Sequence, residues 1–334
     1  MTAERIQPSV DARPVVSVVI PTYNRAHLVG RAIQSVLRQT YSDFELIVVD
    51  DGSTDNTVEV VEAYQDPRIR LIRLARNYGV SRARNEGIQA ARGEWVAFLD
   101  NDDEWLPRKL ELQMARFRET DDPRITVVYG RGYRRYGESA ELKLPPPRVF
   151  FEGDVFDHLL GSWSPGASGF VVRRSSLLGV GGFDEELAGS EDWDLWLRLA
   201  KAGHHFAAVR ELVGVKYEHA GQLSTDPVAR RRDFAILDRK WGRIIERRLG
   251  AAGYRRWKAA WYANIQYAQF MRLREAMARG DRIAAWRYCL AMCRFLPWSR
   301  KYMIHGLALA TLGRGAYGAL ARARETLLHR EEGR

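Results

Sequence analysis

The sequence predicts an α/β fold: a doubly wound, mainly parallel sheet with helices on both faces, followed by an all-helical C-terminal extension. Two observations support this prediction. Between residues 15 and 118, short apolar strand patterns alternate four times with helical patterns. From about residue 226 the strand patterns stop, and Arg, Ala, Trp and Leu dominate the sequence.

The first half of the chain has the clearest pattern. Continuous β-branched and apolar runs are typical of strands buried on both faces of a parallel sheet. Pro107 suits the first turn of a helix. In chain order, the predicted elements are a strand at 15–20, a helix at 28–37, a strand at 44–49, a helix at 53–64, a strand at 69–74, a helix at 81–91, a strand at 95–99 and a helix at 107–118.

The pattern then becomes less regular. Residues 130–165 are rich in Gly, Pro and Arg, and we expect mainly loop there. Further strands are predicted at 125–129, 169–172 and 211–217, and a further helix at 191–201. In the C-terminal region we expect four or five amphipathic helices, interrupted near Gly250, Gly280, Pro297 and Gly313.

The composition narrows the class of protein. The 334 residues can bury a large core, and the formal net charge is +10. Such a charge suits a nucleic acid, an anionic membrane surface or a phosphorylated substrate. No nucleic-acid recognition motif accompanies it, so we expect no nucleic-acid partner.

The location is expected to be cytoplasmic. No run of 18 apolar residues is present. Residues 1–14 are polar, so we expect a disordered N-terminal segment and no signal peptide. Cys289 and Cys293 lie four residues apart without ligand partners nearby, which favours core thiols in a reducing compartment.

A cluster of carboxylates follows the strand predicted at 95–99. Asp100, Asp102 and Asp103 come directly after it, and such close carboxylates repel unless a positive charge lies among them. Open α/β sheets bind ligands at this edge. A divalent cation that carries a substrate phosphate would suit the cluster. The alternative is an acidic turn that caps the helix near Pro107.

The first two strands also end in polar side chains. In the segment 21–25, Tyr23 offers an aromatic face for a base, and Arg25 a cation for a phosphate. Asp50 and Asp51 could accept hydrogen bonds from a ribose or a base. Plain turns are the alternative at both places. Neither a dinucleotide-binding glycine motif nor a P-loop is present.

Two predicted helix starts carry further candidates. Arg82, Arg84 or Asn85 could lie along a diphosphate, because a helix N-terminus attracts anions. At the other helix, Glu191 or Asp192 could be a general base, while its neighbour caps the helix. The alternatives are a solvated basic face and a simple cap. His219, after the last strand, could be a further metal or phosphate ligand.

Taken together, these segments closely resemble family 2 glycosyltransferases with the GT-A fold. Six motifs occur in the family's order and spacing across about residues 15–225. They are Val-Ser-Val-Val-Ile-Pro-Thr-Tyr-Asn-Arg (16–25), Val-Val-Asp-Asp-Gly-Ser-Thr-Asp (48–55), Asn-x-Gly-x-x-x-Ala-Arg-Asn (77–85), Gly-Glu-x-Val-Ala-Phe-Leu-Asp-Asn-Asp-Asp (93–103), Gly-Gly-Phe-Asp-Glu (181–185) and Glu-Asp-Trp-Asp-Leu-Trp (191–196).

The resemblance implies a role for each matching residue. Asp192 stands at the position of the catalytic base. Asp102, with Asp100, would coordinate Mn²⁺ or Mg²⁺. His219 lies outside the six motifs and is a candidate ligand only through its place after the last strand. The expected nucleotide-binding residues are Pro21, Thr22, Tyr23, Arg25, Asp50, Asp51, Arg84, Asn85 and Asp100. The expected donor and acceptor pocket comprises Trp105, Gly182, Phe183, Asp184, Glu191 and Trp193.

The implied reaction is an inverting transfer from a nucleotide-diphosphate sugar, commonly a UDP-sugar, to an acceptor hydroxyl of a glycan or a lipid-linked acceptor. A metal would stabilise the charge that develops on the leaving diphosphate. One base on the opposite face of the sugar would deprotonate the acceptor. We expect the reaction to serve polysaccharide, cell-wall or glycolipid synthesis in a bacterium.

Two other functions compete with this one. A sugar-phosphate nucleotidyltransferase of related architecture would be expected to have a Gly-rich, Lys- or Arg-containing loop after the first strand, and the segment 21–25 lacks it. An inactive scaffold in a glycan synthase complex is the other competitor. Every acidic position that the mechanism needs is filled, which argues against a scaffold.

These patterns predict three parts: the N-terminal segment 1–14, a glycosyltransferase domain at 15–225 and a basic helical region at 226–334. The domain would have a nucleotide-binding half at 15–105 and an acceptor half at 106–225. The helical region mixes cationic with interfacial aromatic residues, which suggests peripheral contact with the inner face of the cell membrane. Packing on the sheet or on a second copy of the chain is the alternative. The residues concerned are Arg230 to Arg232, Arg247, Arg248, Arg255, Arg256, Trp257 and Trp261.

Overall fold

The structure is a computed structural model, and its described residues form two compact units. The described residues are 14–136, 142–143, 150–161, 166–218 and 226–293. The first unit contains the described residues up to 185 together with 191–218. The second contains 186–190 and the C-terminal helices. The short segment 186–190 therefore clusters with helices that follow it by almost forty residues.

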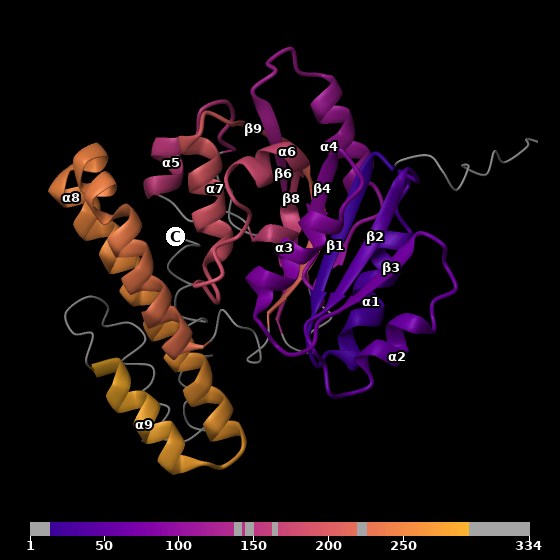
Figure 1. Cartoon of the computed structure of the whole chain (residues 1–334). Coiled ribbons are helices and arrows are strands. Elements are labelled where there is room, and N and C mark those ends of the chain that lie inside the picture. The colour runs from indigo at the N-terminus through magenta and orange to yellow at the C-terminus, as the bar shows by residue number, and fades with distance from the viewer. Residues whose placement is uncertain (1–13, 137–141, 144–149, 162–165, 219–225, 294–334) are drawn as a thin grey trace, which may run out of the picture. The chain divides into compact units, whose positions relative to one another are not determined.

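The first unit is built on one sheet whose strands mainly run in the same direction (Figure 1). Its order is β3-β2-β1-β4-β8-β6-β9-β5, and β7 pairs with β6. The pairs β3–β2, β2–β1, β1–β4 and β6–β9 are parallel, whereas β8 is antiparallel to both β4 and β6. The expected α/β class with a mainly parallel sheet is confirmed.

The strands have the following bounds: β1 Val16–Thr22, β2 Phe44–Asp50, β3 Ile69–Arg73, β4 Trp95–Phe98, β5 Glu104–Trp105, β6 Ile125–Tyr136, β7 Leu142–Lys143, β8 Phe170–Arg173 and β9 His205–Glu218. The helices are α1 Ala26–Leu37, α2 Thr57–Glu62, α3 Val80–Ala90, α4 Lys109–Arg118, α5 Phe156–Gly161, the 3₁₀ turn η1 Ala167–Gly169, α6 Arg174–Gly179, α7 Glu191–Lys201, α8 Pro227–Ala278 and α9 Arg282–Cys293.

Both faces of the central strands are covered, which explains their unbroken apolar sequences. Val16, Val18 and Ile20 of β1 join a core cluster with residues of α1, α2 and α4. Val19 points the other way, because side chains alternate along a strand. A Cβ on Gly87 of α3 would lie only 2.4 Å from Val19 Cγ1. Gly87 thus lets α3 approach the second face closely.

The expectation of loop at 130–165 is wrong in part. β6 continues to Tyr136 and pairs with β9 along that length, and α5 follows. The prediction failed because glycines usually indicate loops, whereas the glycines of this segment allow two strands to pack closely. A Cβ on Gly132 would lie 2.6 Å from the carbonyl oxygen of Gly214 on β9. The prolines at 145–147 lie outside the described residues.

The second unit contains α8 and α9. α8 runs from Pro227 to Ala278 and has one non-helical residue, Gly250, with φ +70° and ψ 172°. Gly280, also at positive φ, separates α8 from α9. The two expected interruptions therefore occur as predicted, whereas Pro297 and Gly313 lie outside the described residues.

Several residues expected to face a membrane are instead buried. Trp257 and Trp261 are buried, and their ring centroids lie 5.5 and 6.1 Å from that of Phe234. Arg230 is buried as well. These three residues are core residues of the second unit, so the expectation that they face a lipid surface is wrong. None of the helices in the described ranges is long and apolar enough to cross a membrane.

Candidate active site

The three carboxylates that follow β4 lie together. Ligand oxygens of Asp100, Asp102 and Asp103 are within 4.8 Å of one another. An all-oxygen set of this kind suits Mg²⁺ or Mn²⁺, whose coordination phosphate oxygens and water can complete. This acidic triad therefore fits a divalent ion that carries a diphosphate.

Asp103 is the buried member of the acidic triad, and two distant segments hold it. Ser168 Oγ donates to Asp103 Oδ2 at 2.9 Å, and the backbone N–H of Tyr217 donates to Oδ1 at 3.2 Å. Ser168 Oγ also accepts from the N–H of Asp100. Burial, with the charges of Asp102 and Asp100, raises the pKa of Asp103 well above its usual range. Sequence analysis did not single out Ser168 as a partner of Asp103.

Arg84 of α3 connects the acidic triad to α7. Arg84 is only 3% exposed, and its guanidinium pairs with Asp100 Oδ1 at 2.6 Å and with Glu191 Oε1 at 2.5 Å. Burial opposes its charge, but Asp100 and Glu191 outweigh that effect and raise the pKa of Arg84. We expected Arg84 to lie along a diphosphate. Its two arms bind carboxylates from two different elements, and the expected contact with a diphosphate stays a prediction.

The ends of β1 and β2 present buried polar atoms that no described residue satisfies. Thr22 and Asp50 are neighbours in the parallel register. Thr22 Oγ1 and Asp50 Oδ1 are buried and have no hydrogen-bond partner in the described part of the chain. Since buried polar atoms are normally paired, these two indicate that a ligand or water binds at this edge.

Asp51 joins the end of β2 to the start of α3. Its Oδ1 accepts from the N–H of Tyr78 and its Oδ2 from that of Gly79, both at 2.8 Å. Burial raises the pKa of Asp51. The ring of Tyr78 is exposed, as is that of Tyr23. Tyr78 is thus a second aromatic face near the expected base site, and sequence analysis did not single it out.

The segment 21–25 is tied to its neighbours at several points. Asn24 has a φ of +50°, and its Oδ1 accepts from the N–H of Thr54 at 2.8 Å. Asn101 donates to the carbonyl oxygen of Pro21 at 2.7 Å. The N–H of Arg25 donates to Thr57 Oγ1. The segment is therefore fixed in place before any ligand binds.

Asp192 is the second residue of α7, and its Oδ1 accepts from the N–H of Trp193 at 2.7 Å. Burial and the neighbouring Glu191 carboxylate raise the pKa of Asp192 to about 7, although Arg84, the N–H of Trp193 and Lys216 act in the opposite direction. A base with a pKa near the working pH is well matched to proton transfer. Glu191 pairs with Arg84, so the two acidic neighbours have different surroundings.

Lys216 of β9 is a charged residue that sequence analysis missed. A Cβ on Gly166 would lie 3.9 Å from Lys216 Nζ and 3.8 Å from Asp192 Oδ2, so both atoms border the same space. Burial lowers the pKa of Lys216, but Asp103, Glu218 and Asp100 outweigh it and raise the pKa. Lys216 thus places a positive charge near both the acidic triad and Asp192. The sequence pattern of a strand does not indicate that this lysine lies near the acidic residues.

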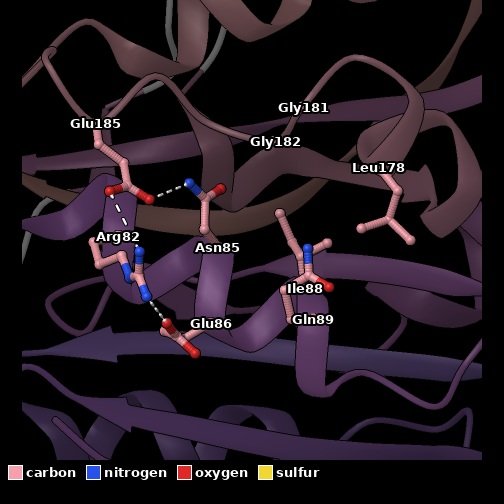
Figure 2. A pocket seen from close by; sticks show the side chains of 9 residues that line it. All are labelled: Arg82, Asn85, Glu86, Ile88, Gln89, Leu178, Gly181, Gly182 and Glu185. Atoms are coloured by element: carbon pink, nitrogen blue, oxygen red, sulfur yellow. Dashed lines mark hydrogen bonds and ion pairs between the residues drawn. The ribbon is translucent and has the colours of Figure 1, made fainter.

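Asn85 holds the loop that contains the Gly-Gly-Phe-Asp-Glu motif (Figure 2). Its amide nitrogen donates to the carbonyl oxygen of Phe183 and to Glu185, and its oxygen accepts from the N–H of Phe183. Gly182 is at φ +69°, and a Cβ there would lie 2.5 Å from Asn85 Oδ1. Asn85 therefore fixes this loop, and its expected contact with a diphosphate stays a prediction.

Figure 2 shows the small pocket between α3 and this loop. Arg82 pairs there with Glu86 and Glu185, away from the carboxylates that Arg84 binds. The pocket is lined by Arg82, Asn85, Glu86, Ile88, Gln89, Leu178, Gly181, Gly182 and Glu185.

The remaining expected pocket residues within the described part of the chain are buried or partly buried. The Trp105 ring is buried, and its Nε1 donates to the carbonyl oxygen of Ser168 at 2.9 Å. The Trp193 ring is buried too, and its Nε1 donates to the carbonyl oxygen of Leu159. Phe183 is buried and Asp184 partly buried. His219 lies outside the described residues.

Comparison with known proteins identifies the family. A family model described as "Glycosyl transferase family 2" matches residues 17–178. The chain is 31% identical over 243 residues to WfgD of Escherichia coli, a "UDP-Glc:alpha-D-GlcNAc-diphosphoundecaprenol beta-1,3-glucosyltransferase", covering 72% of this chain and 90% of WfgD. It is 37% identical over 228 residues to "Succinoglycan biosynthesis protein ExoO" of Rhizobium meliloti, covering 65% of this chain and 64% of ExoO.

Among solved structures, S. aureus TarS 1–349 in complex with UDP-GlcNAc matches with a TM-score of 0.53 and 18% sequence identity. The match covers 80% of this chain and 88% of the TarS chain, and it shows a common fold. The site at the carboxyl ends of the strands and these comparisons define a glycosyltransferase. The chain belongs to glycosyltransferase family 2 and has the GT-A fold, as the sequence motifs predicted.

Replacing Arg84 tests the connection between α3, the acidic triad and α7. Arg84→Met should lower the free energy of unfolding by about 3–5 kcal/mol, because Asp100 and Glu191 would keep their charges without a counter-charge. Urea denaturation would measure the loss. Arg82→Met is the matched control on the same helix, and we expect no measurable change because its ion pairs are exposed. Equal losses in both variants would contradict a special role for Arg84.

Proposed function

We propose that this protein transfers a sugar from a nucleotide-diphosphate sugar, most simply a UDP-sugar, to an acceptor hydroxyl with inversion at the anomeric carbon. The acceptor would be a growing glycan or a lipid-linked glycan in polysaccharide or glycolipid synthesis. The names of WfgD and ExoO support that setting, and the TarS complex supports a UDP-sugar. The observation that carries the proposal is the pair of Arg84 ion pairs, which join Asp100 of the acidic triad to Glu191, the neighbour of Asp192.

Different residues of the first unit would bind the nucleoside and the metal ion in such a reaction. Thr22, Asp50 and Asp51 lie at the edge where the nucleoside would bind, and the unpartnered Thr22 Oγ1 and Asp50 Oδ1 are available to it. Asp102 and Asp100 would hold Mn²⁺ or Mg²⁺, which supplies Lewis-acid stabilisation to a leaving diphosphate.

Asp192 completes the reaction as its base. Its carboxylate would accept the proton of the acceptor hydroxyl as that oxygen attacks the anomeric carbon. Glu191 would stay paired with Arg84 and so hold the start of α7 near the acidic triad. Because the diphosphate is a good leaving group, a single base is sufficient for the inverting reaction.

The two competing functions account for less of the site. A nucleotidyltransferase would not need a general base at the start of α7. An inactive scaffold would not need buried, unpartnered polar atoms at the ends of β1 and β2. The glycosyltransferase proposal uses both features.

Donor hydrolysis gives the most direct test. Each of a panel of UDP-, GDP- and dTDP-sugars would be incubated with Mn²⁺ or EDTA, and the released nucleotide measured. We expect slow release from one donor, lost with EDTA and in Asp102→Ala. Asp192→Asn should bind that donor with unchanged affinity but transfer poorly. If no donor is hydrolysed and none raises the Tm with metal present, even with glycan acceptors added, the scaffold function is favoured.

The pH dependence tests Asp192 separately. The base must be ionised, so kcat/KM should fall about tenfold per pH unit below pH 7 and level off above it. Because burial makes the ionised form unfavourable in the folded state, Asp192→Asn should be at least as stable as wild type at pH 8. A flat profile between pH 5 and pH 8 would argue against Asp192 as the base.

We also propose peripheral membrane contact, placed on α9 instead of on Trp257 and Trp261. Ile283 and Leu290 are 71% and 63% exposed, and Trp286 lies on the same face of the helix. This apolar stripe is opposite the buried Ala285 and Cys289. Exposed Arg282 and Arg287 flank the stripe, a charge distribution that suits an anionic lipid surface.

Flotation with vesicles of anionic and of neutral lipid would test the α9 stripe. The full-length protein should float with anionic vesicles at low salt, and much less in 0.5 M salt, because screening weakens the attraction to the lipid. The variant Ile283→Ser with Leu290→Ser should lose flotation and keep donor hydrolysis. Equal flotation of this variant and the wild type would exclude α9 as the membrane contact.

A further inference from the structure

The segment 186–190, just before α7, is fixed by two charged residues of α8. Asp233 Oδ1 accepts from the N–H of Ala188 at 3.0 Å, and Asp233 Oδ2 accepts from the N–H of Gly189 at 2.9 Å. Arg230 Nη1 donates to Ser190 Oγ at 3.0 Å. Three consecutive residues of the segment are thus bound, two through their backbone and one through its side chain.

These contacts are sealed from solvent. Asp233 and Ser190 are fully buried, and Arg230 nearly so. Hydrogen bonds in which one partner is charged are the stronger ones in proteins, and a buried carboxylate is costly unless its oxygens are satisfied. Asp226 is the N-cap of α8, and its side chain accepts a hydrogen bond from the N–H of Val228. This cap fixes the first turn of the helix, and Asp233 lies in the next turn. The geometry of the segment is therefore well determined.

The segment continues directly into the catalytic part of the chain. Ser190 is joined by a peptide bond to Glu191, which pairs with Arg84, and Asp192 follows. The place where Ser190 is held therefore restricts where α7 can begin. Neither the family model, which ends at residue 178, nor the six sequence motifs include α8.

We propose that Asp233 and Arg230 are positioning residues that set the location of Asp192 through the segment 186–190. They touch no substrate in this proposal. A displacement of about 1 Å of a catalytic group can cost about a hundredfold in rate, so a loosened segment would lower turnover strongly. The proposal assigns a function to α8, and it rests on the proposed role of Asp192 as the base.

The test compares point variants of the full-length protein. In Asp233→Asn the amide nitrogen cannot accept, so one of the two backbone N–H groups loses its partner. We expect kcat to fall at least tenfold while the KM and Kd for the donor stay within twofold, because the nucleotide-binding residues are untouched. Hydrogen exchange at the amides of Ala188 and Gly189 should become faster in the same variant.

Two further variants separate positioning from general destabilisation. Asp238→Asn removes a carboxylate of α8 that accepts from Tyr254, away from the segment, so kcat should stay at the wild-type value. Arg230→Lys can still donate to Ser190 and should retain more activity than Arg230→Met. All assays would be run at least 15 °C below the lowest Tm, so that unfolding does not contribute.

The outcomes distinguish this inference from the proposed function. If Asp192→Asn is inactive and Asp233→Asn has wild-type kcat, the positioning role is excluded and the base assignment stands. If Asp192→Asn is fully active, the proposed base is wrong and so is a positioning role toward it. A rise in the donor KM that matches the loss of kcat in Asp233→Asn would also overturn the inference, since it would indicate a disturbed nucleotide site.

Discussion

The buried Arg84 guanidinium between Asp100 and Glu191 is the interaction on which the rest of the site depends. It joins a residue after β4 to the first residue of α7, and the helix that carries it is anchored through Asp51 at the end of β2. Removing the guanidinium and the Glu191 carboxylate from water is costly, and their mutual contact, together with the partly exposed Asp100, offsets that cost. The site is therefore assembled by charge pairing before any substrate is present.

The acidic triad shows how the fold tolerates concentrated negative charge. Asp103 is satisfied by Ser168 and by a backbone N–H of β9, and Lys216 adds a positive charge near Asp103 and Asp192. Asp102 is left at the partly buried side of the triad, where a cation and a phosphate can reach it. Burial destabilises a lone carboxylate, and at Asp103 the contacts with Ser168 and the N–H of Tyr217 offset that effect.

Much of the first unit could be predicted from the sequence, because unbroken apolar strands and polar strand ends have a direct physical cause. The acidic triad and Asp192 follow from the order of the motifs. Contacts between distant segments could not be predicted in this way. Gly132 indicated loop although it permits close strand contact, and Trp257 suggested a membrane anchor although it is buried. Lys216 occupies an ordinary strand position, so only the three-dimensional fold brings it to the site.

The two units are interleaved along the chain, since 186–190 belongs to the second unit and 191–218 to the first. The C-terminal helices are therefore not an independent module that recombination could exchange at one junction. A homologous helix grafted after residue 225 would have to provide an acidic and a basic side chain three residues apart, matching Asp233 and Arg230, to engage the retained segment. Diversification of this region among relatives should accordingly proceed by paired changes in the segment and the helix, more readily than by replacement of the helix as a block.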